Sequence, residues 1–172
     1  MRYNISAQDT EKFKTLRCGD LVLLTGYILT GRDSAHKRIA NSLSHLHTLP
    51  FDIKDQLIYY TGPCPSPPNR VIGSCGPTTS SRMDSYTPAL HDLGLKGSIG
   101  KGPRSISVIN SIIKNKAIYF AATGGAGALF AECVKTSQII AYEDLGPEAV
   151  HMLFVVDMPL IVAIDSLGKT IY

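Results

Sequence analysis

The sequence predicts an α/β fold with a largely parallel sheet. Segments rich in valine, isoleucine and aromatic residues alternate with segments whose apolar residues recur at helical spacing. Single helical segments separate most of the strand-like ones, and crossover helices of this kind connect parallel strands. The chain has 172 residues, 44% of them hydrophobic and 18% charged, which is enough for a substantial core. We therefore expect one α/β domain over residues 1–172.

The first half of the chain begins this alternation. LVLLTGYIL (21–29) is typical of a buried strand, and DSAHKRIANSLSHL (33–46) has apolar residues at helical spacing, with Asp33 suited to the first turn. A second strand is expected in QLIYYTGP (56–63). The cluster TGPCPSPPNR (61–70) holds four of the ten prolines, so it is neither helix nor central strand. We interpret it as an ordered excursion, with an interdomain linker as the alternative.

The second half repeats the pattern. A short helix is predicted in TPALHDLG, because proline suits its first turn and glycine its end. After it we expect a loop (97–105), a helix (105–115), a strand (117–123), a glycine-rich turn, a helix (128–135), a strand (138–145), a mixed segment (147–157) and a last strand (160–165).

Three loops after predicted strands carry positive charge. They are TGRD, GPTTSSRMD (76–84) and GSIGKGPRS (97–105), and their cations are Arg32, Arg82, Lys101 and Arg104. In open α/β sheets, ligands bind in loops beyond the carboxyl ends of the strands. These loops therefore form the candidate binding surface.

Arg32 and Arg82 suit the binding of a carboxylate or phosphate. The guanidinium of Arg32, between a strand and a helix, can donate two parallel hydrogen bonds to such a group. Its alternative role is a salt bridge to Asp33 or another nearby acid. Arg82 follows a run of hydroxyl-bearing residues from Thr78 at a predicted helix start, which favours an anion. Its alternative is a self-capped turn in which Asp84 neutralises Arg82.

The remaining polar features are less specific. Lys101 lies between two glycines that let the backbone approach a ligand, although a solvated lysine has the same pattern, and the loop lacks the Walker A spacing. TGGAGAL (123–129) departs from the dinucleotide-binding pattern, and tight packing explains its glycines equally well. His36, four residues after Arg32, is a candidate neighbour of the site.

Composition excludes several classes of function. The net charge of +3 is scattered along the chain, so neither nucleic acid nor a membrane surface is an expected partner. Apolar stretches fall short of the roughly 20 residues that span a bilayer, and no signal peptide is visible, so we expect a cytoplasmic protein. The four cysteines lack a metal-binding spacing and are expected to be reduced thiols.

Several segments, taken in order, resemble one known family. GRDSAHKRI, GPTTSSRMD, SIGKG, TGGAGAL, YEDLGPEAV and PLIVAIDSLGKTIY look like the C-terminal domain or β subunit of the class I, iron–sulfur-dependent fumarases and L-tartrate dehydratases. The matches run from about residue 20 to residue 172. The resemblance implies a swivelling β/β/α domain with a mostly parallel central sheet. It also implies a hydro-lyase that reversibly hydrates fumarate to malate, or one that dehydrates tartrate.

The resemblance also implies roles for individual residues. Arg32, Arg82 and Lys101 match the substrate-binding positions of the family. Such cations suit a dianionic substrate, because they also stabilise the charge that develops when the carbon beside a carboxylate loses its proton. Thr78 matches the catalytic threonine, whose hydroxyl is too weak a base to act without a partner group.

Two neighbours of these residues bear on the match. Ser81 stands where the family usually has glycine, and a serine disfavours a positive φ there. Asp84 is the nearest acid in this chain, and we expect it to be structural. The resemblance implies that the acid that assists Thr78 belongs to the α portion, which is a partner of this chain.

Cofactor and partner follow from the same resemblance. A [4Fe–4S] cluster held by an α subunit would bind the substrate as a Lewis acid, and we assign no cluster ligand to this chain. We expect activity only with that α subunit, and a homodimer within an α2β2 assembly follows from the resemblance alone. The alternative from a different class is a stand-alone anion- or nucleotide-binding module that uses TGGAGA and GKG.

Overall fold

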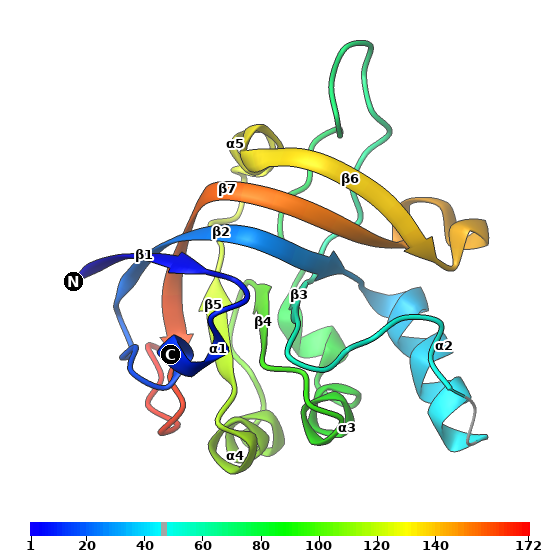
Figure 1. Cartoon of the computed structure of the whole chain (residues 1–172). Coiled ribbons are helices and arrows are strands. Elements are labelled where there is room, and N and C mark those ends of the chain that lie inside the picture. Colours follow the sequence, from blue (N-terminus) through cyan, green and yellow to red (C-terminus); the bar gives the residue numbers. More distant parts are fainter. Residues whose placement is uncertain (46–47) are drawn as a thin grey trace.

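The structure, a computed structural model, describes residues 1–45 and 48–172 and shows a seven-stranded sheet with helices packed around it (Figure 1). The strands are β1 (Arg2–Ser6), β2 (Leu21–Thr30), β3 (Leu57–Tyr59), β4 (Gly97–Gly100), β5 (Ile118–Ala121), β6 (Val134–Ala141) and β7 (Val150–Ile164). The helices are α1 (Thr10–Phe13), α2 (Asp33–Ser44), α3 (Thr87–Asp92), α4 (Ile106–Asn115) and α5 (Gly127–Cys133), with 3-10 turns η1 (Ser80–Met83) and η2 (Glu143–Glu148). None of the helices in these ranges has the length and apolar character needed to cross a membrane.

Five of the strands close into a mixed barrel. The strand order is β1-β2-β3-β4-β5-β7-β6, and β2 also pairs with β7, which completes a ring of β2, β3, β4, β5 and β7. The pairs β2–β3, β3–β4 and β4–β5 are parallel, whereas β7 is antiparallel to both β2 and β5. The α/β class is confirmed, and β1 to β5 pair in parallel as expected, but the sheet as a whole is mixed and closed, because β7 lies antiparallel between β5 and β2. The swivelling β/β/α arrangement stays a prediction.

Strand β7 is long and contains Pro159 within it. We expected a mixed segment followed by a separate strand, but one strand runs through both. Residues 156–157 form a bulge opposite Thr25, where Asp157 has a φ of 51° and its amide donates to the Thr25 hydroxyl at 3.0 Å. A bulge absorbs extra residues without ending the strand, and Pro159 then pairs with Leu23. A single strand can therefore reach both β2 and β5.

Strand β4 corrects another expectation, since residues 97–105 were predicted to be a loop. Its glycines resemble loop residues, but they are required by crowding inside the barrel. A Cβ on Gly97 would lie 2.5 Å from the Ile118 carbonyl oxygen, and one on Gly100 would overlap the Ser80 hydroxyl. Glycine therefore permits this strand to lie between β3 and β5.

Element boundaries differ from the predictions in smaller ways. Strand β1 was not expected, and β6 begins at Val134 directly after α5, which is four residues before the predicted strand. The helix predicted over 33–46 corresponds to α2, which ends at Ser44. The last residue of the prediction, 46, lies outside the described residues, as does 47. These differences leave the order of helices and strands around the barrel intact.

Successive buried side chains of β3 point to opposite faces of the barrel wall. Leu57 and Tyr59 of β3 belong to the largest apolar cluster, which also contains Phe13 of α1 and Phe130 of α5. The intervening Ile58 points to a second cluster under α2 and α3, and a third cluster lies under α4. This period of two is typical of a strand buried on both faces.

The proline-rich segment stands out from the barrel as an ordered loop (Figure 1). The Cys64 amide donates to the Ser74 carbonyl at 2.9 Å, and the Gly73 amide returns to the Cys64 carbonyl at 3.2 Å. At its base, the Thr61 hydroxyl donates to the Gly76 carbonyl at 2.8 Å. Both ends return to the barrel, so the interpretation as an excursion is confirmed.

Arg104, one of the four loop cations, is a structural residue inside the fold. Its side chain is fully buried and donates from Nε to Asp84 at 2.6 Å, while the Ser105 amide donates to the other Asp84 oxygen at 2.6 Å. Its other nitrogens donate to Ser98 at 3.0 Å and Thr87 at 2.8 Å. The expectation of a structural Asp84 is thereby confirmed, and the proposed Arg82–Asp84 neutralisation is wrong.

We predict that Arg104→Met lowers the free energy of unfolding by about 3 kcal/mol, because it leaves a largely buried carboxylate without its counter-ion. Urea denaturation measures the change. Arg70→Met on the exposed loop is the control and should leave the unfolding free energy almost unchanged. Equal effects of the two substitutions would contradict this role of Arg104.

Candidate functional site

The loops after the four parallel strands of the barrel open at the same end. Beyond the strands, the Gly31 amide donates to the Tyr59 carbonyl at 3.1 Å, the Tyr60 amide to Ile99 at 2.8 Å and the Ala122 amide to Gly100 at 2.7 Å. These bonds keep neighbouring segments aligned as they leave the barrel. The structure therefore brings the predicted cationic loops together at one end of the barrel, as expected for carboxyl ends of parallel strands. We call this end, with the loops that carry Arg32, Thr78, Arg82 and Lys101, the mouth of the barrel.

The GPTTSSRMD segment lies between the ends of β3 and β4. The Thr78 amide donates to the Tyr60 carbonyl at 2.7 Å, and the Ser80 amide donates to the Lys101 carbonyl at 2.9 Å. The segment continues only into the four-residue turn η1, so the expected helix N-terminus does not form an anion site here. Thr78 and Lys101 are nevertheless held on adjacent segments.

Thr78 is positioned by its backbone and keeps its hydroxyl available. The residue is 9% exposed, and its side chain makes no hydrogen bond within the described ranges. A hydroxyl at the rim of the barrel without a protein partner can exchange a proton with a bound molecule, provided that a stronger base assists it. The catalytic role of Thr78 remains a prediction.

Arg32 is the residue that precedes α2, and its Nη groups make no hydrogen bond among the described residues. Its Nε is 3.2 Å from Glu148 Oε1, but within the described residues the guanidinium makes no well-aligned hydrogen bond. The guanidinium packs directly on Gly62, where a Cβ would lie 2.6 Å from Cζ and from Nε. Arg32 is thus held by charge and packing while its hydrogen-bonding capacity is unused. The expected alternative, a salt bridge between Arg32 and some nearby acid, is present, although the acid is Glu148 and not Asp33.

Arg82 pairs with Asp33, the first residue of α2. Its Nε donates to Asp33 Oδ1 at 2.9 Å, and Nη2 donates to Oδ2. These hydrogen bonds lower the pKa of the Asp33 carboxyl below its usual value. The pair joins η1 to α2, and Nη1 of Arg82 makes no hydrogen bond within the described part of the chain. Arg82 therefore combines a structural contact with one free donor group.

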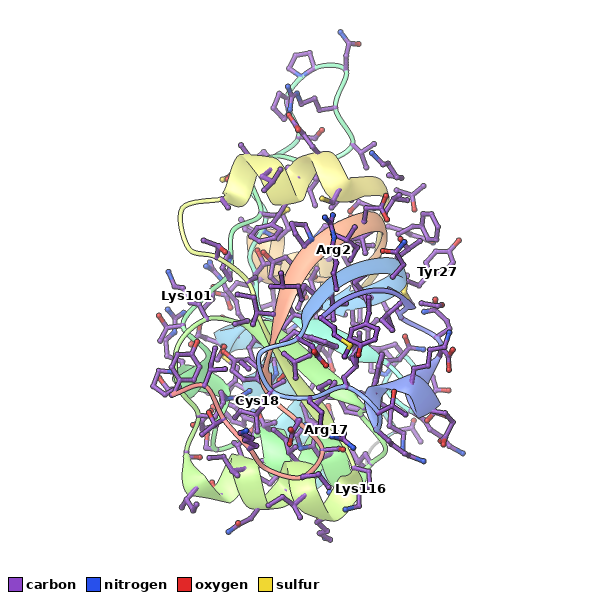
Figure 2. The ribbon with its side chains drawn as sticks, turned by 90° about the vertical axis from the view of Figure 1, so that its left-hand side faces the viewer. Arg2, Arg17, Cys18, Tyr27, Lys101 and Lys116 are labelled. Carbon is purple, nitrogen blue, oxygen red and sulfur yellow. The ribbon has the colours of Figure 1, made fainter. Side chains whose placement is uncertain are left out.

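Lys101 follows β4 and lies beside the glycine-rich turn after β5. A Cβ on Gly124 would be 3.9 Å from Lys101 Nζ, so the TGGAGAL turn flanks this ammonium group. The ammonium has no ion pair or hydrogen bond among the described residues. Figure 2 shows Lys101 at the edge of the molecule, on the side opposite Tyr27. The turn thus belongs to the same mouth as Lys101.

Two further residues define the surroundings of Arg32. His36 is fully buried, and its Nδ1 lies 2.9 Å from the Arg32 carbonyl oxygen, so it supports the Arg32 backbone from behind. Ser81 lies in η1 and is not among the residues with positive φ, so serine is compatible with the backbone where the family usually has glycine. Sequence reasoning identified both positions but could not place them.

Glu148 and Gly62 are parts of the site that sequence reasoning missed. Glu148 lies more than 100 positions from Arg32 in the sequence, and no spacing rule connects them. YEDLGPEAV, which contains Glu148, contributed to the family resemblance and is the only signal that points to it. Gly62 was treated as part of the proline-rich cluster.

The cysteines do not form a cluster site in the described ranges. No group of three or more His, Cys, Asp and Glu residues there could hold a metal ion. All four cysteines are free thiols, and burial raises the pKa of Cys75 to about 12, so this thiol is protonated in the chain by itself. Residues 1–45 and 48–172 therefore offer no ligand set for an iron–sulfur cluster.

Comparison with known proteins identifies relatives along the whole chain. Residues 1–172 match the family described as Fumarase C-terminus. The chain is 38% identical over 178 residues to a putative L(+)-tartrate dehydratase subunit beta of Methanocaldococcus jannaschii, covering 100% of this chain and 91% of that protein. It is also 38% identical over 153 residues to the anaerobic class I fumarate hydratase of Escherichia coli, covering 87% of this chain and 28% of that protein. Fumarate hydratase 2 of Leishmania major is 35% identical over 158 residues, and the chain again spans only 28% of that relative.

We predict that Gly62→Ala displaces the Arg32 guanidinium while the fold survives. The new Cβ would overlap Cζ and Nε, which lie at the end of a flexible side chain, and Gly62 has no positive φ that alanine would strain. The free energy of unfolding should change by less than about 1 kcal/mol. A crystal structure of the variant should show the guanidinium moved away from residue 62. An unmoved guanidinium would contradict the contact.

The burial of His36 predicts a pH dependence of stability. Burial lowers its pKa from 6.5 to about 4, and burial does the same for His91. Between these pH values the unfolded chain binds protons that the native chain does not, so stability falls as the pH drops from about 6.5 to about 4. His36→Gln should make this fall shallower in urea denaturation. An unchanged slope would show that His36 is protonated in the native protein.

Proposed function

The chain belongs to the Fumarase C-terminus family of class I fumarate hydratases and L(+)-tartrate dehydratase β subunits, and from this we propose that it is the β subunit of a two-subunit iron–sulfur hydro-lyase. The proposed reaction is the reversible hydration of fumarate to malate. The match over 91% of a putative tartrate dehydratase subunit beta favours L(+)-tartrate as the alternative substrate. Both substrates are small dicarboxylates, so both need cationic groups at the site.

The observation that carries this proposal is the unused hydrogen-bonding capacity of Arg32. Arg104 donates to side chains from every guanidinium nitrogen and Arg82 donates from two. In Arg32 the buried Nε has a charge contact with Glu148, whereas the Nη groups have no hydrogen bond among the described residues and remain free to donate. A planar guanidinium with free donors binds a carboxylate through two parallel hydrogen bonds. Lys101, whose ammonium group is also free in the described part, suits the second carboxylate.

The residues of the mouth can be assigned steps in this reaction. Arg32, Lys101 and the free Nη1 of Arg82 hold the dicarboxylate and stabilise the charge that develops when its C–H proton leaves. Thr78 relays that proton with the help of an acid on the partner. A [4Fe–4S] cluster on the partner would supply the Lewis acid for the departing hydroxyl. We propose that the chain has this role as one domain over residues 1–172.

The assembly follows from the relatives. The name "subunit beta" of the Methanocaldococcus relative supports an α partner. The chain spans only 28% of the Escherichia coli fumarate hydratase, and we propose that a partner supplies the part of such an enzyme that this chain does not match. A homodimer of this chain within an α2β2 assembly stays a prediction. The TGGAGA turn flanks Lys101, as the nucleotide-binding alternative also requires, so it is the family match over residues 1–172 that favours the hydro-lyase over that alternative.

We predict that this chain hydrates fumarate only when mixed anaerobically with a cluster-bearing α chain. In that complex, Arg32→Ala should lower kcat/KM by about 100-fold or more, because it removes a charged contact to the substrate. Thr78→Val should act mainly on kcat. The rates are measured by the loss of fumarate absorbance, with L(+)-tartrate as the parallel substrate.

The control for these variants is Lys37→Ala, on the exposed part of α2 and without an ion pair in the described chain. It should leave the rates unchanged. Hydration of fumarate by this chain alone, without iron, would overturn the proposed function. Stabilisation of the isolated chain by a nucleotide, but not by dicarboxylates with the α chain present, would favour the binding module instead.

A further inference from the structure

Glu148 contacts the two groups that define the position of Arg32. Its Oε2 accepts a hydrogen bond of 2.6 Å from the Ser34 amide in the first turn of α2. Its Oε1 lies 3.2 Å from Arg32 Nε, and the Glu148 side chain is only 19% exposed. The carboxylate therefore lies between a helix N-terminus, which favours a negative charge, and the guanidinium.

The direction of these contacts matters for a ligand. Glu148 uses its short, well-aligned hydrogen bond on the backbone of α2 and offers Arg32 only a charge contact at Nε. The terminal Nη groups of Arg32 make no hydrogen bond within the described residues. An acid placed in this way fixes the guanidinium from one side and leaves the outer donors for an incoming carboxylate.

Glu148 is itself held firmly in place. It ends η2, and η2 is fastened to α2 by a bidentate pair in which Arg38 donates to Asp144 at 2.6 and 2.8 Å. Arg38 also lies over the Tyr142 ring, with 5.1 Å from Cζ to the ring centroid. Behind Glu148, the Thr30 hydroxyl contacts the Ala149 carbonyl at 3.4 Å at the end of β2. The position of Glu148 thus depends on the fold and not on Arg32.

We propose that Glu148 is a positioning residue for Arg32 in the hydro-lyase reaction, an inference that rests on the proposed function. It holds the guanidinium against Gly62 so that the outer nitrogens face the substrate carboxylate. The contrasting role would be that of a competitor, which occupies Arg32 until substrate displaces it. The two roles predict opposite effects on KM, because removing a positioning group weakens substrate binding and removing a competitor strengthens it.

The test uses Glu148→Gln in the complex with the cluster-bearing α chain. Glutamine keeps the volume and one acceptor oxygen but removes the charge that holds Arg32. We expect KM for fumarate to rise about tenfold while kcat changes much less, since a charge-assisted contact is lost and no reacting group is removed. Glu148→Asp, which keeps the charge but shortens the reach, should give a smaller rise in the same direction. It also serves as the second variant should glutamine prevent folding.

A double-mutant cycle separates positioning from a general structural effect. In the Arg32→Ala background, Glu148→Gln should have no further effect on KM, because Glu148 acts only through Arg32. The matched control is Glu143→Gln, an exposed acid in the same turn η2 without an ion pair in the described chain, and it should leave both constants unchanged. An unchanged or lowered KM in Glu148→Gln, or an effect that persists without Arg32, would overturn the proposal.

An independent readout distinguishes failure of this inference from failure of the proposed function. In the isolated full chain, the ¹H–¹⁵N NMR signal of Arg32 Nε should shift and exchange faster with water in Glu148→Gln than in wild type. A signal that does not respond would overturn the role of Glu148 directly. Absence of hydratase activity in the wild-type complex would instead overturn the proposed function, whatever the NMR result.

Discussion

The antiparallel pairing of β7 with both β2 and β5 is the constraint on which the site depends. It closes a row of four parallel strands into a ring, so the loops that follow β2, β3, β4 and β5 converge on one mouth. In an open sheet the loop after β2 and the loop after β5 would lie at opposite sides of β3 and β4. Closure places Arg32, Thr78 and Lys101 on neighbouring segments at one end of the barrel, although the sequence separates them by up to 69 positions (101 − 32).

The four cations of these loops differ in how completely the protein satisfies them. Arg104 is buried and fully engaged, so it supports the fold. Arg82 donates to Asp33 from two nitrogens and has no hydrogen bond at Nη1, whereas the Nη groups of Arg32 and the ammonium group of Lys101 have no hydrogen bond within the described chain. Donors without partners are costly, so the Nη groups of Arg32 and the ammonium group of Lys101 need water or a ligand to satisfy them. This difference supports the proposal that Arg32 and Lys101 bind the substrate carboxylates.

The sequence predicted the α/β class, the cationic loops and the position of the excursion, because these depend on local patterns. It could not predict the closed barrel, since β7 had to be recognised as one strand through the bulge at Asp157 and through Pro159. Strand β4 was hidden because its glycines, which crowding requires, resemble a loop. The partners in the ion pairs could not be predicted either, because each pair joins segments that are separated in the sequence. Arg82 pairs with Asp33, Asp84 with Arg104, and Arg32 with Glu148.

We propose that this mouth binds the two carboxylates of the substrate, while a partner chain supplies the cluster. A crystal structure of the complex with its α chain and a bound dicarboxylate tests it most directly. We predict carboxylate oxygens at about 3 Å from the Arg32 Nη atoms and from Lys101 Nζ, with the Thr78 hydroxyl beside the substrate carbons. A dicarboxylate held by the α chain alone, with Arg32 and Lys101 facing water, would contradict the claim.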